Sequence, residues 1–462
     1  MPRPQTPGLQ TPGLQTPGLC HLGCNALCYP GLAHPGSGET AVTARRGVLF
    51  AWCLYDWAYS AFNTVVSTFV IATYFVRAVA TDPATGTAQW AAAQAIAGFL
   101  IALLAAPLGA VADRGGRRRF MLIVFTLIMA IATGCLWFVR PVHADVTLAL
   151  VLVGTATVAY EIATVFYNAM LPEVAGPGRI GRVSGLAWGA GYAGGLVGLS
   201  LCLVLLINPD PPLFGLDRGQ AEPVRATALF AAFWLLLFGW PVMVAVPDRG
   251  PRRSWLVAIR EGLADFGGAL RRAAAQPGLI RFLVARMLYS DGLTTLFSFG
   301  AIFAAGVFGM DAKQVLLLGI ALNVTAGIGA LTFAFLEDRI GAKATVLISL
   351  ACLTVLGALI LLARTESEFW LVALCLGVFV GPAQAASRSL MARIAPAEDC
   401  NAQFGLYALS GRVTGFVGPA ALGLITAVTH SQRAGMAVIV VLLAAGGGLL
   451  AATRLRSTPQ TP

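Results

Sequence analysis

Seven stretches of this chain run for 19 to 22 residues without a single charged side chain. A bilayer core of roughly 30 Å is crossed by about 20 helical residues, so each stretch is long enough to span a membrane. Hydrocarbon offers an open backbone no hydrogen-bond partner, and we therefore expect these stretches to be helices. They are residues 57–76, 91–112, 120–139, 226–246, 315–335, 344–363 and 435–453.

Five weaker apolar segments carry the interior charges and bring the expected number of spans to twelve. They are residues 146–170, 184–207, 280–309, 368–392 and 402–428. The composition agrees, since 57% of the residues are hydrophobic and 11% are charged, whereas about 25% are charged in an average soluble protein. The sequence therefore predicts an all-α, multi-pass membrane protein.

The basic residues predict the orientation. With both termini on the cytoplasmic side, 20 of the 31 Lys and Arg residues fall inside, 7 fall outside, and the other four lie within or at the ends of spans. Cytoplasmic loops usually carry such an excess. Arg286, one of the four, is expected to extend toward the cytoplasmic interface. The net charge of +10 thus reflects topology, and no nucleic-acid partner is expected because no basic segment is also rich in aromatic residues.

Two internal repeats indicate a duplication. "GAVADRGGRRR" (109–119) and "AFLEDRIGAKA" (334–344) share a small residue, Asp-Arg, Gly and a final basic residue at the same spacing. "GLAWGAGYAGGLVG" (185–198) matches "GLYALSGRVTGFVG" (405–418) in the same way. The chain is therefore predicted to contain two parallel six-helix bundles. The expected segments are a disordered low-complexity tail (1–44), the first bundle (45–246), a basic cytoplasmic linker (247–278), the second bundle (279–456) and a short tail (457–462).

Polar side chains form stripes on otherwise apolar spans. Asp56, Ser60, Asn63 and Ser67 share one helix face, because they are spaced by four, three and four residues. Similar stripes occur near residues 157–168, 291–298, 384–388 and 407–414. Ionisable residues at membrane depth usually mark the path of a solute or ion. The predicted pathway residues are Asp56, Asn63, Glu161, Tyr167, Asn168, Asp291, Gln384, Arg388 and Arg412.

The repeated loop motif resembles the hallmark of the major facilitator superfamily, and this resemblance covers about residues 45–456. It implies a fold in which the two bundles rock about a central cavity. Asp113 can accept hydrogen bonds from the positive start of a neighbouring helix and from an arginine. A solvated basic turn would explain one copy of the motif, whereas two matching copies favour a gate latch. The latch residues are Gly109, Asp113, Arg114, Gly116, Arg118, Asp338, Arg339 and Gly341.

Four motifs on these stripes resemble the autophagy-related vacuolar amino-acid effluxer family. They are "YDWAYSAF" (55–62), "FYNAMLPEV" (166–174), "LYSDGLTT" (288–295) and "GPAQAASRSLMARIAP" (381–396). Tyr59 stands where the family usually has Asn, so a solute contact made by that Asn does not carry over. The resemblance implies export of an amino-acid-like solute, although bacterial members need not share that substrate.

The sequence is compatible with more than one role for each interior charge. Asp56 either forms a structural pair with Arg388 or Arg412, or takes part in proton or solute binding. Asp291 and Glu161 are either proton carriers or hydrogen-bonded structural acids. Removing one partner of a buried ion pair is strongly destabilising, which offers a way to separate these readings.

The chain lacks signatures of catalysis. It has no Gly-rich phosphate loop ending in Lys-Ser/Thr, and its four histidines lie outside the predicted spans. We therefore expect no enzyme, cofactor or metal. The predicted function is a secondary active transporter that moves a small polar or zwitterionic solute by alternating access, coupled to protons. The expected setting is a monomer among the lipids of a bacterial inner membrane. A lysolipid flippase and a non-transporting membrane sensor are the alternatives.

Overall fold

The computed structural model describes residues 38–176, 178–248 and 254–455. The described residues from Arg45 onward form one compact unit, and the architecture below is that of this unit. Residues 1–37 of the predicted disordered tail and the predicted C-terminal tail from residue 457 lie outside the described residues. Helix α1 already begins at Gly38.

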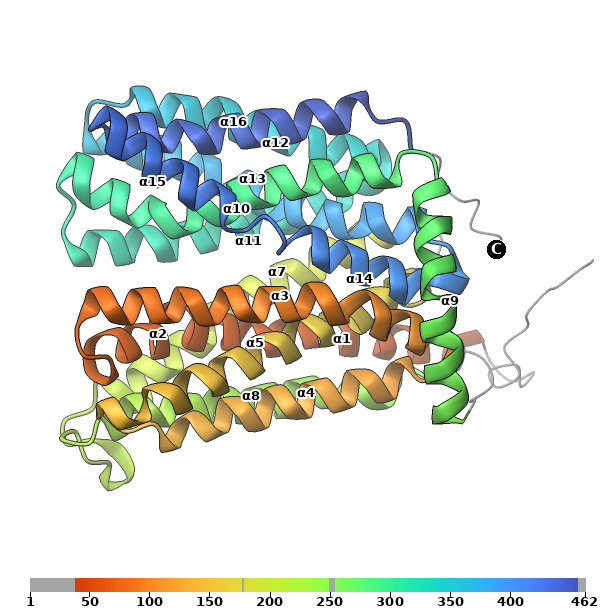
Figure 1. Cartoon of the computed structure of the whole chain (residues 1–462), viewed down its shortest axis with the longest axis horizontal. Helices are drawn as coiled ribbons and strands as arrows, with labels where there is room; N and C mark the ends of the chain where they lie inside the picture. Colours follow the sequence, from red (N-terminus) through yellow and green to blue (C-terminus); the bar gives the residue numbers. More distant parts are fainter. Residues whose placement is uncertain (1–37, 177, 249–253, 456–462) are drawn as a thin grey trace, which may run out of the picture. The chain divides into compact units, whose positions relative to one another are not determined.

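The first half of the unit is built from helices, drawn in red to yellow-green in Figure 1. Its first span changes from an α-helix to π-helical turns, a local widening that is frequent at functional sites. In chain order the elements are α1 (Gly38–Ala61), η1 (Phe62–Phe69), α2 (Ile71–Tyr74), η2 (Phe75–Val79), α3 (Pro83–Gly115), α4 (Arg118–Cys135), η3 (Leu136–Phe138), η4 (His143–Asp145), α5 (Val146–Ala169), α6 (Leu171–Ala175), α7 (Ile180–Leu201), η5 (Cys202–Ile207), η6 (Leu213–Gly215) and α8 (Glu222–Ala245).

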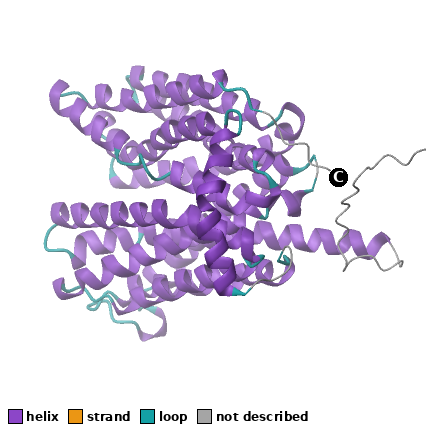
Figure 2. Ribbon diagram, turned by 45° about the vertical axis from the view of Figure 1, so that its right-hand side comes forward, coloured by secondary structure: helices purple, strands orange, loops and turns teal. Residues whose placement is uncertain are grey.

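The linker helix α9 (Trp255–Ala275) follows and runs across the ends of the other helices (Figure 1). We call this end of the bundle the linker end and the opposite end the far end. The second half contains α10 (Leu279–Phe308), α11 (Ala312–Ile340), α12 (Ala342–Leu362), α13 (Glu366–Ile394), η7 (Ala397–Asp399), α14 (Cys400–Ser410), α15 (Val417–Thr429) and α16 (Gln432–Ala452). Figure 2 shows that helices and loops alone make up the described residues.

Polar caps determine where four helices begin at the far end. The Asp82 carboxylate accepts from two backbone amides in the first turn of α3. Asp311 and Thr365 form capping boxes at the starts of α11 and α13, and Ser431 caps α16. Such side chains satisfy backbone amides that have no partner within the helix, which fixes each helix start at a defined depth.

Eleven helices among the described residues are long and apolar enough to cross a membrane. They correspond to eleven of the twelve predicted spans. The prediction of one continuous helix over residues 402–428 was wrong, because this segment forms two shorter helices, α14 and α15, separated by residues 411–416. Hydropathy does not distinguish a broken span from a continuous one, since both are apolar along their whole length.

The two halves pack against each other through pairs of helices that the duplication relates. The main interfaces are α7 against α11 and α3 against α14. Gly185 of α7 lies against Ala334 of α11, and an added Cβ would be 2.4 Å from the alanine Cβ. The equivalent Gly405 of α14 lies against Ala106 of α3, where a Cβ would be 2.4 Å from the alanine Cα. Small residues thus allow the halves to approach closely at both interfaces.

We predict that Gly185→Ala destabilises the protein. The new methyl group would overlap Ala334, and overpacking of this kind costs about 1–3 kcal/mol. Gly154→Ala is the matched control, because a Cβ at Gly154 meets no atom within 4 Å and alanine favours a helix by about 1 kcal/mol over glycine. The melting temperature in detergent should fall for Gly185→Ala and hold or rise for Gly154→Ala. Equal melting temperatures would contradict the close packing.

Candidate functional site

A buried ion pair joins the halves near the linker end. Arg388 of α13 donates through Nη1 to Asp56 Oδ2 of α1 at 2.9 Å, and the two side chains are 3% and 1% exposed. Tyr59, one turn further along α1, also donates to the Asp56 carboxylate. Of the two arginines proposed from the sequence as partners of Asp56, the structure therefore selects Arg388. Asp56 is thus enclosed by the protein in this conformation.

Further contacts complete the surroundings of Arg388. Its Nη2 donates to the Ser184 carbonyl at 2.7 Å, and its Nε donates to Ser184 Oγ at 3.0 Å. Ser184 Oγ in turn donates to the Ala385 carbonyl at 2.8 Å, back across the boundary between the halves. The guanidinium also lies 5.0 Å from the centroid of the Trp52 ring. Sequence reasoning missed Ser184, which precedes the Gly-rich repeat by one position.

A second ion pair between the halves lies deeper in the bundle and is partly exposed. Arg412, in the break between α14 and α15, donates through Nε to Glu161 Oε1 of α5 at 3.0 Å and also binds it through Nη2. The Arg412 and Glu161 side chains are 40% and 15% exposed. Arg412 lies about 18 Å along the helix axis from the start of α14, which is close to the middle of a bilayer core.

The spacing shared by the two loop motifs corresponds to reciprocal contacts at the linker end. Asp113, at the end of α3, accepts from the backbone amides of Asn401 and Ala402 at 3.1 and 2.9 Å, at the start of α14. It also accepts from Asn401 Nδ2 at 2.6 Å. A carboxylate at a helix N-terminus is favoured by the helix dipole. Gly109 makes this approach possible, since a Cβ there would be 2.4 Å from the Asn401 carbonyl oxygen.

Asp338 makes the equivalent contact from the second half. It lies at the end of α11 and accepts from the backbone amides of Gly181 and Arg182, at 3.0 and 3.3 Å, at the start of α7. Arg393 of α13 donates to the same carboxylate at 3.3 Å. Each half therefore uses its motif aspartate to cap a helix of the other half. The predicted contact with a helix start is present at both aspartates, whereas the described contacts place an arginine only on Asp338. Their role in gating stays a prediction.

The other latch residues occupy supporting positions. Gly116 and Gly341 end α3 and α11 with φ of 60° and 90°, a region that favours glycine. Arg118 is buried and forms a two-pronged ion pair with Glu173, within the first half. Arg114 binds Asp265 of α9, whereas Arg339 follows Asp338 on the last turn of α11. Glu173 belongs to the "FYNAMLPEV" motif, but sequence reasoning did not connect it to Arg118.

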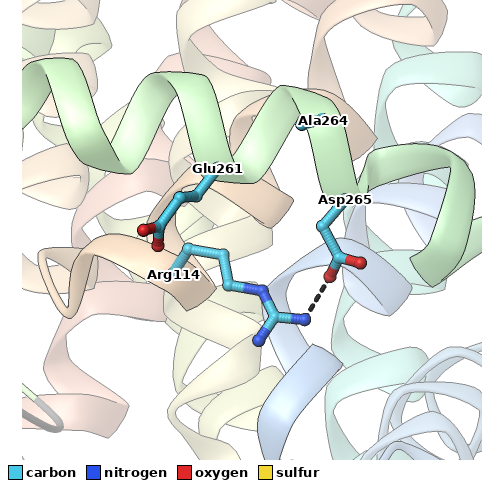
Figure 3. Close-up of a pocket in the computed structure, with 4 residues that line it drawn as sticks. All are labelled: Arg114, Glu261, Ala264 and Asp265. Atoms are coloured by element: carbon cyan, nitrogen blue, oxygen red, sulfur yellow. Dashed lines mark hydrogen bonds and ion pairs between the residues drawn. The ribbon is translucent and has the colours of Figure 1, made fainter.

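The linker helix is fastened to both halves by two arginines and two aspartates, since Arg114 of the first half binds Asp265 of α9. Arg272 donates to Asp265 on its own helix at 2.9 Å and to Asp399, next to α14, at 2.7 Å. Hydrogen bonds from Arg272 and Arg114 lower the pKa of Asp265 to about 2. A pocket of about 500 Å³ lies beside this contact. Figure 3 shows the residues that line it, Arg114, Glu261, Ala264 and Asp265. It lies at the linker end, away from the partly exposed ion pair.

The remaining pathway residues differ in accessibility. Asn63 is exposed on the π-helical turn η1, and Gln384 is half-buried on α13. Tyr167 is fully buried, and its hydroxyl donates to the Trp52 carbonyl at 2.9 Å. Asn168 lies at the edge of the first ion pair, where its Oδ1 is 3.5 Å from the Arg388 guanidinium. Asn63 is thus exposed and Gln384 partly exposed in this conformation, whereas Tyr167 is enclosed.

Asp291 and Arg286 lie on α10 beside the break in the eleventh span. Asp291 is buried and accepts from the backbone amide of Gly418, at the start of α15, at 2.9 Å. The prediction that Arg286 extends toward the interface was wrong. Its guanidinium instead covers the ring of Tyr407 and donates to the Tyr407 carbonyl at 2.6 Å. The last carbonyl groups of α14 lack backbone partners within the helix, and Arg286 supplies a donor to one of them.

Comparison with known proteins agrees with this architecture. The sequence profile of the family described as "Vacuole effluxer Atg22 like" matches residues 78–459. The chain is 24% identical over 410 residues to YxiO of Bacillus subtilis (strain 168), described as an uncharacterized MFS-type transporter, and the match covers 87% of this chain and 93% of that protein. The crystal structure of FucP, a major facilitator superfamily transporter in the outward conformation, superposes with a TM-score of 0.68 at 14% identity, covering 88% of this chain and 99% of that one.

A fungal relative matches over a shorter length. Autophagy-related protein 22 of Cryptococcus neoformans var. neoformans serotype D (strain B-3501A) is 24% identical over 281 residues, which are 55% of this chain. The match spans 49% of the fungal protein, so the chain covers about half the length of that relative.

Fold and relatives together define a multi-pass membrane transporter of the major facilitator superfamily, which is not an enzyme. The family profile extends over most of the chain. The protein accordingly belongs to the Vacuole effluxer Atg22 like family. The superfamily fold and the family resemblance expected from the sequence motifs are both confirmed.

We predict that Asp56→Asn lowers the stability of the protein, because it leaves Arg388 charged and buried without its partner. Breaking such a pair typically costs about 3–5 kcal/mol. The double variant Asp56→Asn/Arg388→Gln should recover much of the loss. Arg140→Gln is the control, since the exposed pair it breaks lies within one half and is worth about 1 kcal/mol or less. Melting temperatures of the four proteins test this, and an unchanged value for Asp56→Asn would show that the pair is not structural.

Proposed function

We propose that the protein is a secondary active transporter that moves a zwitterionic, amino-acid-like solute by alternating access, driven by protons. The description of its family as vacuole effluxers supports export. The proposed class of solute rests on one observation, the partly exposed Glu161–Arg412 pair between the halves. Such a pair offers one fixed charge of each sign, which matches the two charges of an amino acid.

The two ion pairs between the halves differ in what they can bind. The Asp56 and Arg388 side chains are almost completely enclosed, whereas Arg412 retains 40% of its exposure. A solute carboxylate can take the place of Glu161 on the Arg412 guanidinium, whose planar fork suits bidentate binding. A solute ammonium group can then bind the released Glu161 carboxylate. A solute that carries only one of these charges would leave one partner unpaired.

The distribution of contacts suggests how access alternates. From the linker end inward, the halves are joined by the two aspartate caps, by Asp56–Arg388 and by Glu161–Arg412. The polar contacts described at the far end, such as Arg140–Asp145 and Arg433 with the Leu361 carbonyl, lie within one half. In the proposed cycle this conformation admits solute from the far end. Breaking the contacts at the linker end, the cytoplasmic side by the basic-residue asymmetry, opens the other route.

We predict that free amino acids raise the melting temperature of the purified protein, because a ligand that binds only the folded state stabilises it. The matching amines and carboxylic acids should have little effect, since each lacks one charge. Arg412→Gln and Glu161→Gln should each abolish the shift. Arg140→Gln, which removes an ion pair within one half, is the control. Stabilisation by lysolipids instead of amino acids would refute the proposal and favour a flippase.

We also predict that Asp113→Asn shifts the protein toward a state open at the linker end. Cys400 is a natural reporter, because its buried thiol lies 3.6 Å from the Ala169 carbonyl of the other half. Loss of charged hydrogen bonds worth about 1.4 kcal/mol would raise maleimide labelling of Cys400 about tenfold. Peptide mass spectrometry measures this, with the exposed loop variant Asp210→Asn as control. Unchanged labelling in Asp113→Asn would contradict the latch.

A further inference from the structure

The eleventh span is interrupted near the middle of the bundle, between Ser410, where α14 ends, and Val417, where α15 begins. A helix end inside an apolar bundle has backbone groups without partners in its own helix. Hydrocarbon does not satisfy them, so other parts of the protein must do so. The carbonyl end of α14 and the amide end of α15 therefore both need partners, and α10 supplies them.

Arg286 and Asp291 of α10 bind the two ends of the break with opposite charges. Arg286 Nη1 donates to the Tyr407 carbonyl and, at 2.9 Å, to Ser410 Oγ. Asp291 Oδ2 accepts from the Gly418 amide. A cation at a carbonyl end and a carboxylate at an amide end both complement the helix dipoles. The shape of the break therefore depends on the charge of Asp291.

The second carboxylate oxygen of Asp291 is left without a donor. Asp291 is 3% exposed, and its Oδ1 is buried with no hydrogen-bond partner among the described residues. The Thr295 hydroxyl donates instead to the Asp291 backbone carbonyl at 2.8 Å. Gly418 closes the space from the other side, because an added Cβ would be 3.1 Å from this oxygen. A buried carboxylate oxygen without a donor is costly and favours binding of a positive ion.

The groups around Asp291 do not neutralise it. α15 contains no ionisable residue, and the described ion pairs do not include Asp291. On α10 itself Arg286 is bound to α14. Arg281, ten residues before Asp291 on α10, is exposed, and Tyr289 binds Ser387. The ring of Tyr407 on α14 lies under the Arg286 guanidinium. On α11, α13 and α16, Glu337 binds Ser389, Arg388 binds Asp56, and Arg433 binds the Leu361 carbonyl.

We propose that Asp291 Oδ1 is a proton-binding site whose occupancy sets the conformation of the α14–α15 break. A proton needs one oxygen, whereas a bound metal ion needs several, and the described residues contain no cluster of three or more His, Cys, Asp or Glu side chains suited to a metal. The proton enters from water on one side of the membrane, converts the carboxylate into a carboxylic acid, and leaves to water on the other side. No other covalent bond changes.

The break connects this proton site to the proposed solute site. A neutral carboxylic acid is a weaker acceptor than a carboxylate, so protonation weakens the bond to the Gly418 amide. The segment that begins α15 is then less firmly held. Arg412, the cation that faces Glu161, lies in the same short segment. Proton binding at Asp291 thereby loosens the backbone that carries the solute-binding guanidinium, which couples the two sites. This coupling rests on the proposed function.

The test needs no solute. Hydrogen–deuterium exchange of the peptide covering residues 411–418 is measured in lipid nanodiscs from about pH 8 to about pH 5 and corrected for intrinsic exchange. In the wild-type protein, exchange should rise about tenfold on acidification, as expected for losing one charged hydrogen bond. Asp291→Asn, which mimics the neutral acid, should exchange fast at both pH values. Asp210→Asn should behave like the wild-type protein.

Two results would overturn the proposal. The first is a wild-type break whose corrected exchange does not change with pH, a measurement that requires no variant to fold. The second is an Asp291→Asn protein, monodisperse in size-exclusion chromatography, that keeps the wild-type pH response. With either result, amino acids can still raise the melting temperature of the protein. Conversely, a protein that binds no amino acid can still show pH-dependent exchange in residues 411–418. The failure of one proposal is thus distinguishable from the failure of the other.

Discussion

A charged side chain inside a lipid-spanning bundle is stable only where the protein supplies an opposite charge, a hydrogen-bond donor or water. This constraint governs the described interior of the protein. Arg388 is matched by Asp56 and by the Ser184 carbonyl, and Arg286 is matched by the carbonyl end of a broken helix. Most of these partners come from another span, often from the other half. The charges therefore determine which helices must lie together.

The contacts between the halves form a graded series along the bundle. At the linker end, aspartates cap helix starts through neutral backbone amides. Deeper, Asp56 and Arg388 form a sealed pair, and near mid-depth Glu161 and Arg412 form an accessible one. Burial makes the sealed pair costly to separate, whereas partial exposure lowers the cost of separating the accessible pair. In the proposed cycle, the same type of interaction serves closure where it is buried and solute binding where it is exposed.

Sequence periodicity predicted most of the fold and located the charged residues, because apolar length and helical spacing are local properties. The repeats also revealed the duplication, and the equivalent contacts of Asp113 and Asp338 agree with it. Partner choice was beyond the sequence, since Arg388 and Arg412 were both compatible with Asp56. The broken eleventh span was also missed, because its backbone geometry is set by tertiary contacts from Arg286 and Asp291. The sequence did not predict the contacts of Ser184 and Glu173, because their partners Arg388 and Arg118 lie on other helices.

The reciprocal caps at the linker end have a consequence for how such a chain can arise. The motif aspartate of each half binds the fifth span of the other half. Such a contact is isologous, because the same two surfaces meet twice. Two copies of a single ancestral half, related by a two-fold axis along the membrane normal, would already make both contacts. Fusion of the two copies then requires only a connecting segment, which α9 provides. The two halves differ at one equivalent position, where the second half has Arg412 and the first half has Tyr192. This divergence makes the central ion pair asymmetric, although the helices around it are arranged symmetrically.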